Sequence, residues 1–146
     1  MLKTELKNIR HLSLQELEDY FERLGEKKFR TKQVYEWLWQ KHAHSFAEMT
    51  NLSKELRQTL GENFTLPALT INATQYSADG TVKSSFKTHD GHLVEGVLIP
   101  TEKRATACVS SQIGCSLSCK FCATGYIDKK RNLTFDEIYD EVVLIN

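Results

Sequence analysis

Three cysteines, Cys115, Cys119 and Cys122, stand within eight residues of one another at the spacing C-x3-C-x2-C. Three thiolates can hold three irons of a 4Fe-4S cluster, which leaves the fourth iron without a protein ligand. Ferredoxin-type electron carriers usually bind all four irons through cysteine, so an open iron suggests a catalyst. The spacing therefore favours a site at which a substrate or cosubstrate completes the cluster.

A fourth cysteine, Cys108, lies seven residues before Cys115. One interpretation is a small buried hydrophobic residue in a strand, where free cysteines are common. Another is a fourth metal ligand, which would make the chain a zinc-binding RNA-interaction module rather than an enzyme. Structural zinc sites usually pair two short C-x2-4-C knuckles across a longer gap, and this spacing lacks such a division.

A carboxylate that could accept a proton lies in the predicted strand at residues 93–99. Alternation places Glu95 on the strand face that Leu93, Val97 and Ile99 share. If that face is buried, the carboxylate binds its proton more tightly, which suits a proton acceptor near neutral pH. Both faces are largely apolar, so alternation alone does not say which one is buried.

Helices are predicted over residues 1–66, and we expect most of the aromatic side chains there to belong to the core. The Ser/Thr-x-x-Glu spacing of a capping box occurs at Ser13 and Glu16, at Ser45 and Glu48, and at Thr134 and Glu137. Helices are expected from the first box to a stop at Gly25, from about Thr31, and from Ser53 to about Gly61.

After Pro67 the pattern changes to a period of two. It predicts strands near residues 69–74, 81–88 and 93–99 that form an antiparallel meander. A buried strand at residues 104–110, the cysteine loop and a helix from Thr134 follow, and the apolar helix positions are Ile138, Tyr139, Val142, Val143 and Ile145. One strand and one helix make no parallel sheet, so we expect the front end of a larger α/β protein.

Charge gives little global information, because 19 Lys and Arg balance 19 Asp and Glu over 146 residues. Locally, residues 26–41 hold five basic and two acidic side chains, and Lys129, Lys130 and Arg131 follow the cysteines. Such clusters can engage phosphates, although solvated surface charge is the more ordinary interpretation.

The sequence contains no apolar run long enough for a bilayer and no signal-peptide core at its beginning, so a cytoplasmic protein without a membrane partner is expected. In that reducing compartment four cysteines favour metal binding or redox chemistry over structural disulfides.

The motifs resemble those of the radical S-adenosylmethionine (SAM) superfamily, whose signature is C-x3-C-x2-C with an aromatic residue before the last cysteine, here Phe121. The longer run RATACVSSQIGC at residues 104–115 resembles the RlmN/Cfr group of RNA adenine methyltransferases. The same is true of Asn132-Leu133-Thr134 and of Phe29-Arg30-x-x-Gln33-Val34. The resemblance covers the chain from about His11.

This resemblance implies roles for individual residues. Cys115, Cys119 and Cys122 would ligate a 4Fe-4S cluster beside Phe121, and the open iron would bind SAM, whose one-electron reduction yields a 5'-deoxyadenosyl radical. Cys108 matches the redox cysteine that forms a transient disulfide with a methyl-carrying cysteine and releases product from a covalent enzyme-RNA intermediate. Glu95 matches the group's proton-accepting carboxylate.

The resemblance also implies a fold and partners. Residues 1–66 would be a helical accessory RNA-binding domain, residues 67–100 a β meander, and residues 101–146 the first β-α unit of a partial (β/α) barrel, an α+β fragment. The substrates would be adenine C2 of 23S ribosomal RNA and of transfer RNA. A donor such as flavodoxin or ferredoxin would supply electrons to a monomer. Family members are more than twice this length, so we expect this piece alone to be inactive.

Two alternatives within the superfamily remain open. One is a Cfr-type enzyme that methylates C8 of the adenine, and the other is a different radical SAM reaction. Adenine C2 is electron-poor and cannot attack a sulfonium methyl group, so radical chemistry would supply the missing reactivity while the protein orients the reactants.

Overall fold

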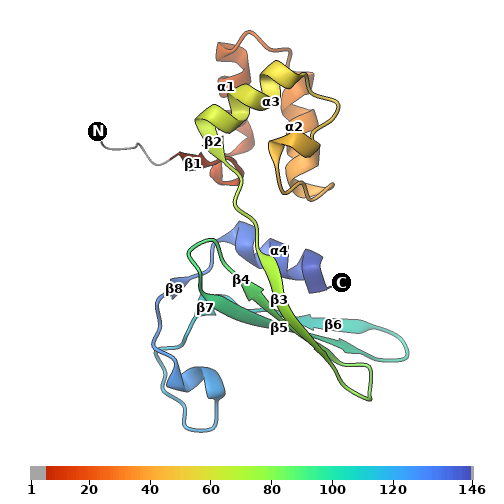
Figure 1. The fold of residues 1–146 in the computed structure, drawn as a ribbon, viewed down its shortest axis with the longest axis vertical. Helices are drawn as coiled ribbons and strands as arrows, with labels where there is room; N and C mark the ends of the chain where they lie inside the picture. Colours follow the sequence, from red (N-terminus) through yellow and green to blue (C-terminus); the bar gives the residue numbers. More distant parts are fainter. Residues whose placement is uncertain (1–5, 146) are drawn as a thin grey trace. The chain divides into compact units, whose positions relative to one another are not determined.

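The chain divides into two compact units, Met1–Pro67 and Ala68–Asn146, each with a hydrophobic core of its own (Figure 1). The structure is a computed structural model that describes residues 6–145. In this described part, no helix is both long enough and apolar enough to cross a bilayer.

The described part of the first unit contains three α-helices. Its elements are β1 (Lys7–Asn8), the 3-10 turn η1 (Ile9–His11), α1 (Leu14–Arg23), α2 (Phe29–Trp39), the 3-10 turn η2 (Phe46–Glu48), α3 (Lys54–Asn63) and β2 (Phe64–Thr65). The two short strands β1 and β2 pair in parallel. They bring the start of the unit next to its end.

The capping box predicted at the start of α1 is confirmed. The Ser13 hydroxyl accepts the Glu16 amide at 3.2 Å, and the Ser13 amide donates to the Glu16 carboxylate at 2.7 Å. Gly25 follows the helix with φ +72°, a conformation that glycine adopts without a Cβ penalty. The other helices differ slightly from expectation, since α2 begins at Phe29 and α3 continues past Gly61 to Asn63.

The other two predicted capping boxes are not complete. The Ser45 hydroxyl donates to the Glu48 carboxylate at 2.9 Å and caps no backbone amide, because a 3-10 turn rather than an α-helix follows. At α4 (Phe135–Ile145) the Glu137 carboxylate accepts the Thr134 amide at 2.9 Å, but the Thr134 hydroxyl donates to that same carboxylate. Glu137 therefore supplies one half of a box.

The core of the first unit is mainly aliphatic. Its buried residues are Ile9, Leu17, Phe21, Val34, Leu38, Ala43, Met49, Leu52, Leu56 and Leu60. The expectation that aromatic side chains belong to this core holds for Phe21 but is wrong for Phe29 and Tyr35, which are 47% and 40% exposed. Val34 and Leu38 occupy the face of α2 that packs inward, so these two rings remain on its outer side.

The second unit is built on one antiparallel sheet, in the order β3-β4-β5-β6. Its strands are β3 (Thr70–Tyr76), β4 (Val82–Lys87), β5 (Leu93–Pro100) and β6 (Ala105–Cys108). The predicted meander is confirmed. After the sheet come the paired strands β7 (Gln112–Ile113) and β8 (Arg131–Asn132), with the 3-10 turn η3 (Ala123–Tyr126) between them, and then α4.

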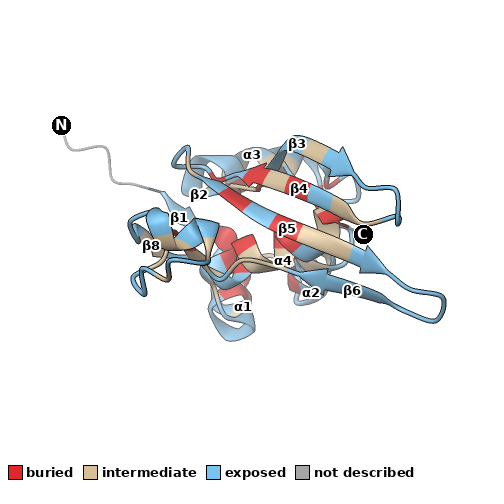
Figure 2. Cartoon of the chain, turned by 90° about the horizontal axis from the view of Figure 1, so that it is seen from below, coloured by how far each residue is buried: buried red, intermediate tan, exposed pale blue. Residues whose placement is uncertain are grey.

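The strand predicted at residues 104–110 exists as β6, but the prediction that it is buried is wrong. All four of its residues are exposed. β6 is the edge strand of this sheet and pairs only with β5, so its outer side has no neighbouring strand in the described chain. Figure 2 shows the contrast between exposed β6 and the buried residues in β4 and β5.

Helix α4 covers one face of the sheet. Phe86 and Val94 point to this covered face, and Gly96 lets the helix approach closely: a Cβ there would lie 3.0 Å from both Ile145 Cδ1 and Phe86 Cε2. A side chain at this position would push the helix away from β5.

The buried residues of α4 are unexpected. Four acidic residues are at most 6% exposed, namely Asp136, Glu137, Asp140 and Glu141, whereas the apolar Phe135 and Val142 are 57% and 45% exposed. The apolar residues of α4 therefore do not form a continuous buried stripe, although Ile145 is buried. The carboxylates can be buried because they accept specific donors, such as the Leu69 amide on Asp140 at 3.0 Å.

Candidate active site and cysteine loop

Glu95 and Cys108 lie on the same face of the sheet. Cys108 pairs directly with Val97 across the β5–β6 ladder, and Val97 shares its strand face with Glu95, two residues earlier. This is the face opposite α4, whose packing partners Val94 and Gly96 alternate with Glu95 along β5. The fold thus brings together a carboxylate and a thiol that are thirteen residues apart in sequence.

The face that carries Glu95 is open to solvent, so the burial considered for it is wrong in this structure. Leu93 and Ile99, which flank Glu95 on the same face, are 53% and 43% exposed. Instead of an apolar enclosure, Glu95 has an ion pair with Lys83 of β4 at 2.9 Å. A pair this exposed is weak and easily exchanged, so Glu95 remains available to another partner.

Ser110 connects Glu95 with Glu141 of α4. The Ser110 hydroxyl donates to the Glu95 carbonyl at 2.8 Å, and the Ser110 amide donates to the Glu141 carboxylate at 2.9 Å. Glu141 is fully buried, and its Oε1 has no hydrogen-bond partner among the described residues. Burial, with a smaller contribution from the nearby Glu137, raises the pKa of Glu141 to about 7 although the Ser110 amide acts to lower it.

The three clustered cysteines lie in one loop that projects from the second unit between β7 and β8 (Figure 1). The Cys115 amide donates to the Ile127 carbonyl at 2.9 Å, and the Cys122 amide donates to the Cys119 carbonyl at 3.1 Å. The backbone therefore folds the loop back on itself. All three thiols are free and partly buried.

Glycines permit close backbone contacts within this loop. A Cβ on Gly125 would lie 2.6 Å from the Cys119 carbonyl oxygen, and one on Gly114 would lie 2.2 Å from the Asp128 carbonyl oxygen. Between the first two cysteines, Ser118 has φ +50°, which is uncommon for a residue with a side chain. Such tight turns place three cysteines in a short segment.

The donor set fits an iron-sulfur cluster by its chemistry. Three free thiols share one loop, and the Leu117 amide approaches the Cys115 sulfur at 3.4 Å, the kind of hydrogen bond that tunes cluster sulfurs. Within residues 6–145, however, no three His, Cys, Asp or Glu side chains are gathered as a metal site. Phe121, expected beside the cofactor, is 94% exposed.

The zinc-module alternative gains no support from the fold. Cys108 is exposed on the edge strand of the sheet, whereas the other three cysteines lie beyond β7 in the loop. Cys108 is not brought to the other thiols in a group that could hold a metal, as far as the described residues go. A four-cysteine site would need a rearrangement of β6 as well as of the loop.

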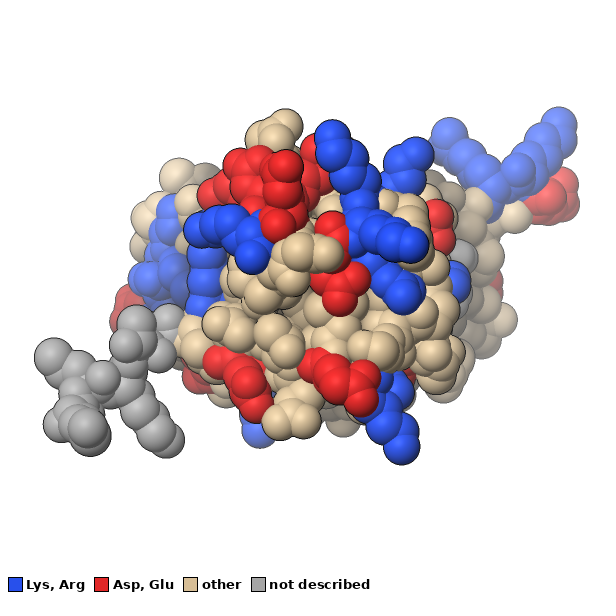
Figure 3. All heavy atoms as spheres, turned by 90° about the horizontal axis from the view of Figure 1, so that it is seen from above, with Lys and Arg blue, Asp and Glu red and all other residues tan. Residues whose placement is uncertain are grey.

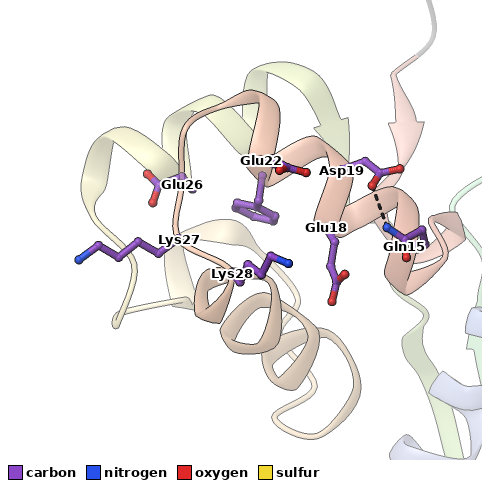
Figure 4. Close-up of a pocket in the computed structure, with 8 residues that line it drawn as sticks. Gln15, Glu18, Asp19, Glu22, Glu26, Lys27 and Lys28 are labelled. Atoms are coloured by element: carbon purple, nitrogen blue, oxygen red, sulfur yellow. Dashed lines mark hydrogen bonds between the residues drawn. The ribbon is translucent and has the colours of Figure 1, made fainter.

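The predicted basic surfaces are mixed with acidic groups. On the face shown in Figure 3, Lys and Arg side chains are interspersed with Asp and Glu side chains. A hollow of about 390 Å3 in the first unit is lined by Gln15, Glu18, Asp19, Phe21, Glu22, Glu26, Lys27 and Lys28 (Figure 4). Four carboxylates against two ammonium groups do not favour the binding of a phosphate there.

Arg131 has a different environment from the one its basic run suggested. It pairs with Asp90 and Glu137 instead of standing free in solvent. The capping-box spacing could have drawn attention to Glu137, but no local pattern links Arg131 to Asp90 or Glu141 to Ser110. These contacts join residues 41 and 31 positions apart.

Over most of its length the chain is similar to proteins described as RNA methyltransferases. Residues 7–66 match the family described as "Ribosomal RNA large subunit methyltransferase N-terminal domain". The chain is 62% identical over 144 residues to a "Probable dual-specificity RNA methyltransferase RlmN" of Cytophaga hutchinsonii, with 97% of this chain and 40% of that protein covered. It is 47% identical over 145 residues to a "Dual-specificity RNA methyltransferase RlmN" of Geotalea uraniireducens, covering 99% of this chain and 41% of that protein.

A solved structure agrees with the described fold. The crystal structure of a radical SAM methyltransferase from Sphaerobacter thermophilus superimposes with a TM-score of 0.80 at 37% identity, covering 95% of this chain and 41% of that chain. The chain therefore spans about two-fifths of the length of the relatives that it matches.

Proposed function

We propose, from the premise that this chain is homologous to the N-terminal part of RlmN-type RNA methyltransferases, that it belongs to a radical SAM enzyme that methylates adenine C2 in 23S ribosomal RNA and in transfer RNA. The observation that carries the proposal is the shared sheet face of Glu95 and Cys108, with the cysteine loop following soon after β6. The carboxylate that would accept a proton and the thiol that would do redox chemistry thus share one sheet face.

Cys115, Cys119 and Cys122 would hold a 4Fe-4S cluster. The exposed Phe121, which directly precedes Cys122 in the sequence, would lie beside it. The cluster and SAM together supply radical chemistry, which can functionalise an electron-poor carbon that nucleophilic methylation cannot. The support is the chemistry of three free thiols in one loop. A flavodoxin or ferredoxin would serve as the electron donor to a monomeric, cytoplasmic enzyme.

Glu95 would accept the proton that leaves adenine C2 once the base is joined to the enzyme. Its exposure and its weak pair with Lys83 leave a carboxylate oxygen free to approach a base. Proton transfer by a positioned carboxylate requires a contact of about 2.6–3.2 Å, directly or through one water. The open sheet face has room for such an approach, since the residues around Glu95 are themselves exposed.

Cys108 would then attack the sulfur of a methyl-carrying cysteine in the remaining part of the enzyme. A sulfur-sulfur bond forms while the carbon-sulfur bond to the modified base breaks, and the carbon takes the electron pair and a proton. A thiol reductant returns the disulfide to two thiols. The exposed, unpaired state of Cys108 at the sheet edge supports this role, because the attacking sulfur must be accessible.

The first unit would contact RNA. Support comes from its match to a ribosomal RNA methyltransferase domain over residues 7–66. The acidic hollow beside α1 is not where we place this contact, because its carboxylates would repel phosphates.

The test uses the complete enzyme encoded by the reading frame that contains these residues. The protein is reconstituted anaerobically with iron and sulfide and incubated with reductant, methyl-labelled SAM and protein-free 23S ribosomal RNA or transfer RNA. Nucleoside mass spectrometry should identify 2-methyladenosine. Cys115→Ala should abolish it, and Ser116→Ala, a neighbouring exposed position, should retain it.

Three other outcomes would contradict the proposal. Label at C8 would replace the proposal with a Cfr-type reaction. An intact cluster with no RNA methylation would contradict the proposed function, and stoichiometric zinc without iron would favour the metal-binding module.

A further inference from the structure

The two ends of the cysteine loop, Ile113 and Arg131, lie side by side, and we call this pair of ends the neck of the loop. Ile113 of β7 pairs with Arg131 of β8, and the Lys130 amide donates to the Ile113 carbonyl at 2.9 Å. Ile113 is buried in the core of the second unit, whereas the loop beyond it is largely exposed. Whatever fixes this neck therefore fixes the path of all three cysteines.

Arg131 makes two bidentate ion pairs at this neck. Its Nε and Nη2 lie 2.8 and 3.0 Å from the two Asp90 carboxylate oxygens. Its Nη1 and Nη2 lie 2.7 and 2.8 Å from the two Glu137 oxygens. One guanidinium thus connects the β4–β5 turn, the end of the cysteine loop and the first turn of α4.

These contacts are well placed to be strong. Arg131 is 28% exposed, Asp90 33% and Glu137 only 6%, so water competes less than at an ordinary surface pair. The planar guanidinium can pair bidentately with two carboxylates at once, a geometry that an ammonium group lacks. The Arg131 hydrogen bonds hold the pKa of Asp90 below its ordinary value. Although burial would raise the pKa of Glu137, its bonds to Arg131 and Thr134 lower it.

We propose that Arg131 is the positioning residue of the cysteine loop. By joining Asp90 and Glu137 it holds the loop neck against the sheet and α4, and so keeps Cys115, Cys119 and Cys122 in one folded segment that would bind the cluster. The part of this inference that concerns a cluster rests on the proposed function. The part that concerns the order of the loop does not.

The test measures thiol reactivity in the metal-free full-length protein under reducing, anaerobic conditions. Alkylation by iodoacetamide is followed at each cysteine by mass spectrometry, with Cys108 of β6 as the internal reference outside the loop. Arg131→Met should raise the rates at the three loop cysteines at least several-fold relative to Cys108. Arg131→Lys keeps the charge but loses the bidentate geometry of the guanidinium, so it should give an intermediate increase in the alkylation rates.

Lys129→Met is the matched control, because it removes one positive charge from the same exposed loop and Lys129 has no ion pair with a carboxylate of the described residues. It should leave the alkylation rates unchanged. If Arg131→Met does not fold by circular dichroism, two milder variants provide the test: Asp90→Asn weakens only the pair with Asp90, and Arg131→Lys weakens both pairs but keeps the charge. Equal loop-cysteine rates in the folded variants and the unchanged protein would overturn the proposal.

A second measurement separates this inference from the proposed function. After reconstitution, iron retained against a chelator should fall in Arg131→Met and stay unchanged in Lys129→Met. If thiol reactivity responds to Arg131 but no protein, including the unchanged one, binds iron, the cluster assignment fails and the positioning role stands. If iron binds equally well with and without Arg131 and the thiols do not respond, the positioning role fails alone.

Discussion

Cys108 stands diagonally across the β5–β6 ladder from Glu95, on the sheet face opposite α4. Diagonal neighbours on one face of an antiparallel pair are about 7–8 Å apart, within reach of a single bound base. Their positions follow from the hairpin register, so one hairpin carries both groups. A base placed over this face could meet the carboxylate and the thiol in turn.

Replacement of Cys108 should stop turnover after the RNA has become attached to the enzyme. In full-length Cys108→Ala, RNA should accumulate as a covalent protein adduct that is visible on a denaturing gel with labelled RNA. Thr106→Ala is the control, because Thr106 lies on the same strand and face and is also exposed. Normal turnover by Cys108→Ala without an adduct would show that this thiol has no resolving role.

Replacement of Glu95 should slow the reaction at the proton-transfer step. Glu95→Gln keeps the shape of the side chain but cannot accept a proton, so methylation should fall by about 10²-fold or more. Single-turnover assays with methyl-labelled SAM measure the change. Glu102→Gln, at an exposed position in the adjacent hairpin loop, should react at the normal rate. A loss below about threefold would count against proton acceptance by Glu95.

The buried Glu141 should make stability depend on pH. Burial raises its pKa from 4.5 to about 7, so the folded state keeps the proton over a range in which the unfolded chain releases it. Its stabilising contribution is complete below pH 4.5 and is lost as the pH rises to 7, by roughly 3 kcal/mol at most. Glu141→Gln should remove this loss.

Urea unfolding followed by circular dichroism at several pH values between 4.5 and 8 measures the effect. Glu141→Gln should gain stability over the unchanged protein as the pH increases, because the amide never ionises. Glu102→Gln, at an exposed site, should follow the unchanged protein throughout. Parallel curves for all three proteins would mean that Glu141 titrates normally.

The close contact at Gly125 should make the cysteine loop intolerant of a side chain. In Gly125→Ala the new Cβ would meet the Cys119 carbonyl oxygen at 2.6 Å and its amide nitrogen at 2.9 Å, so the backbone must shift. We expect the iron bound per chain after reconstitution to fall several-fold, and overpacking to cost about 1–3 kcal/mol.

Gly61→Ala is the control for this substitution, since the nearest atom to its new Cβ is 3.8 Å away, within a helix. It should bind iron normally and gain up to about 1 kcal/mol from helix propensity. Equal iron content in both variants would show that the contact between Gly125 and Cys119 does not shape the metal site.

Local patterns in the sequence were sufficient to predict most elements of this protein. The Ser13 box, the alternation in β3 to β5 and the spacing of Cys115, Cys119 and Cys122 each depend on residues a few positions apart. The motif resemblance used the same short-range information, and the homologous proteins agree with it. The roles assigned to individual site residues stay predictions for the experiments above.

Tertiary structure decided which side of each element is buried. Both faces of β5 are apolar in sequence, and only the packing of α4 against Val94 and Gly96 leaves Glu95 on the open side. The same packing buried four acidic residues of α4, two of which meet donors far away in sequence: the Leu69 amide meets Asp140 and the Ser110 amide meets Glu141. Periodicity states which residues share a face, whereas burial and pairing depend on long-range contacts that a short stretch of sequence does not contain.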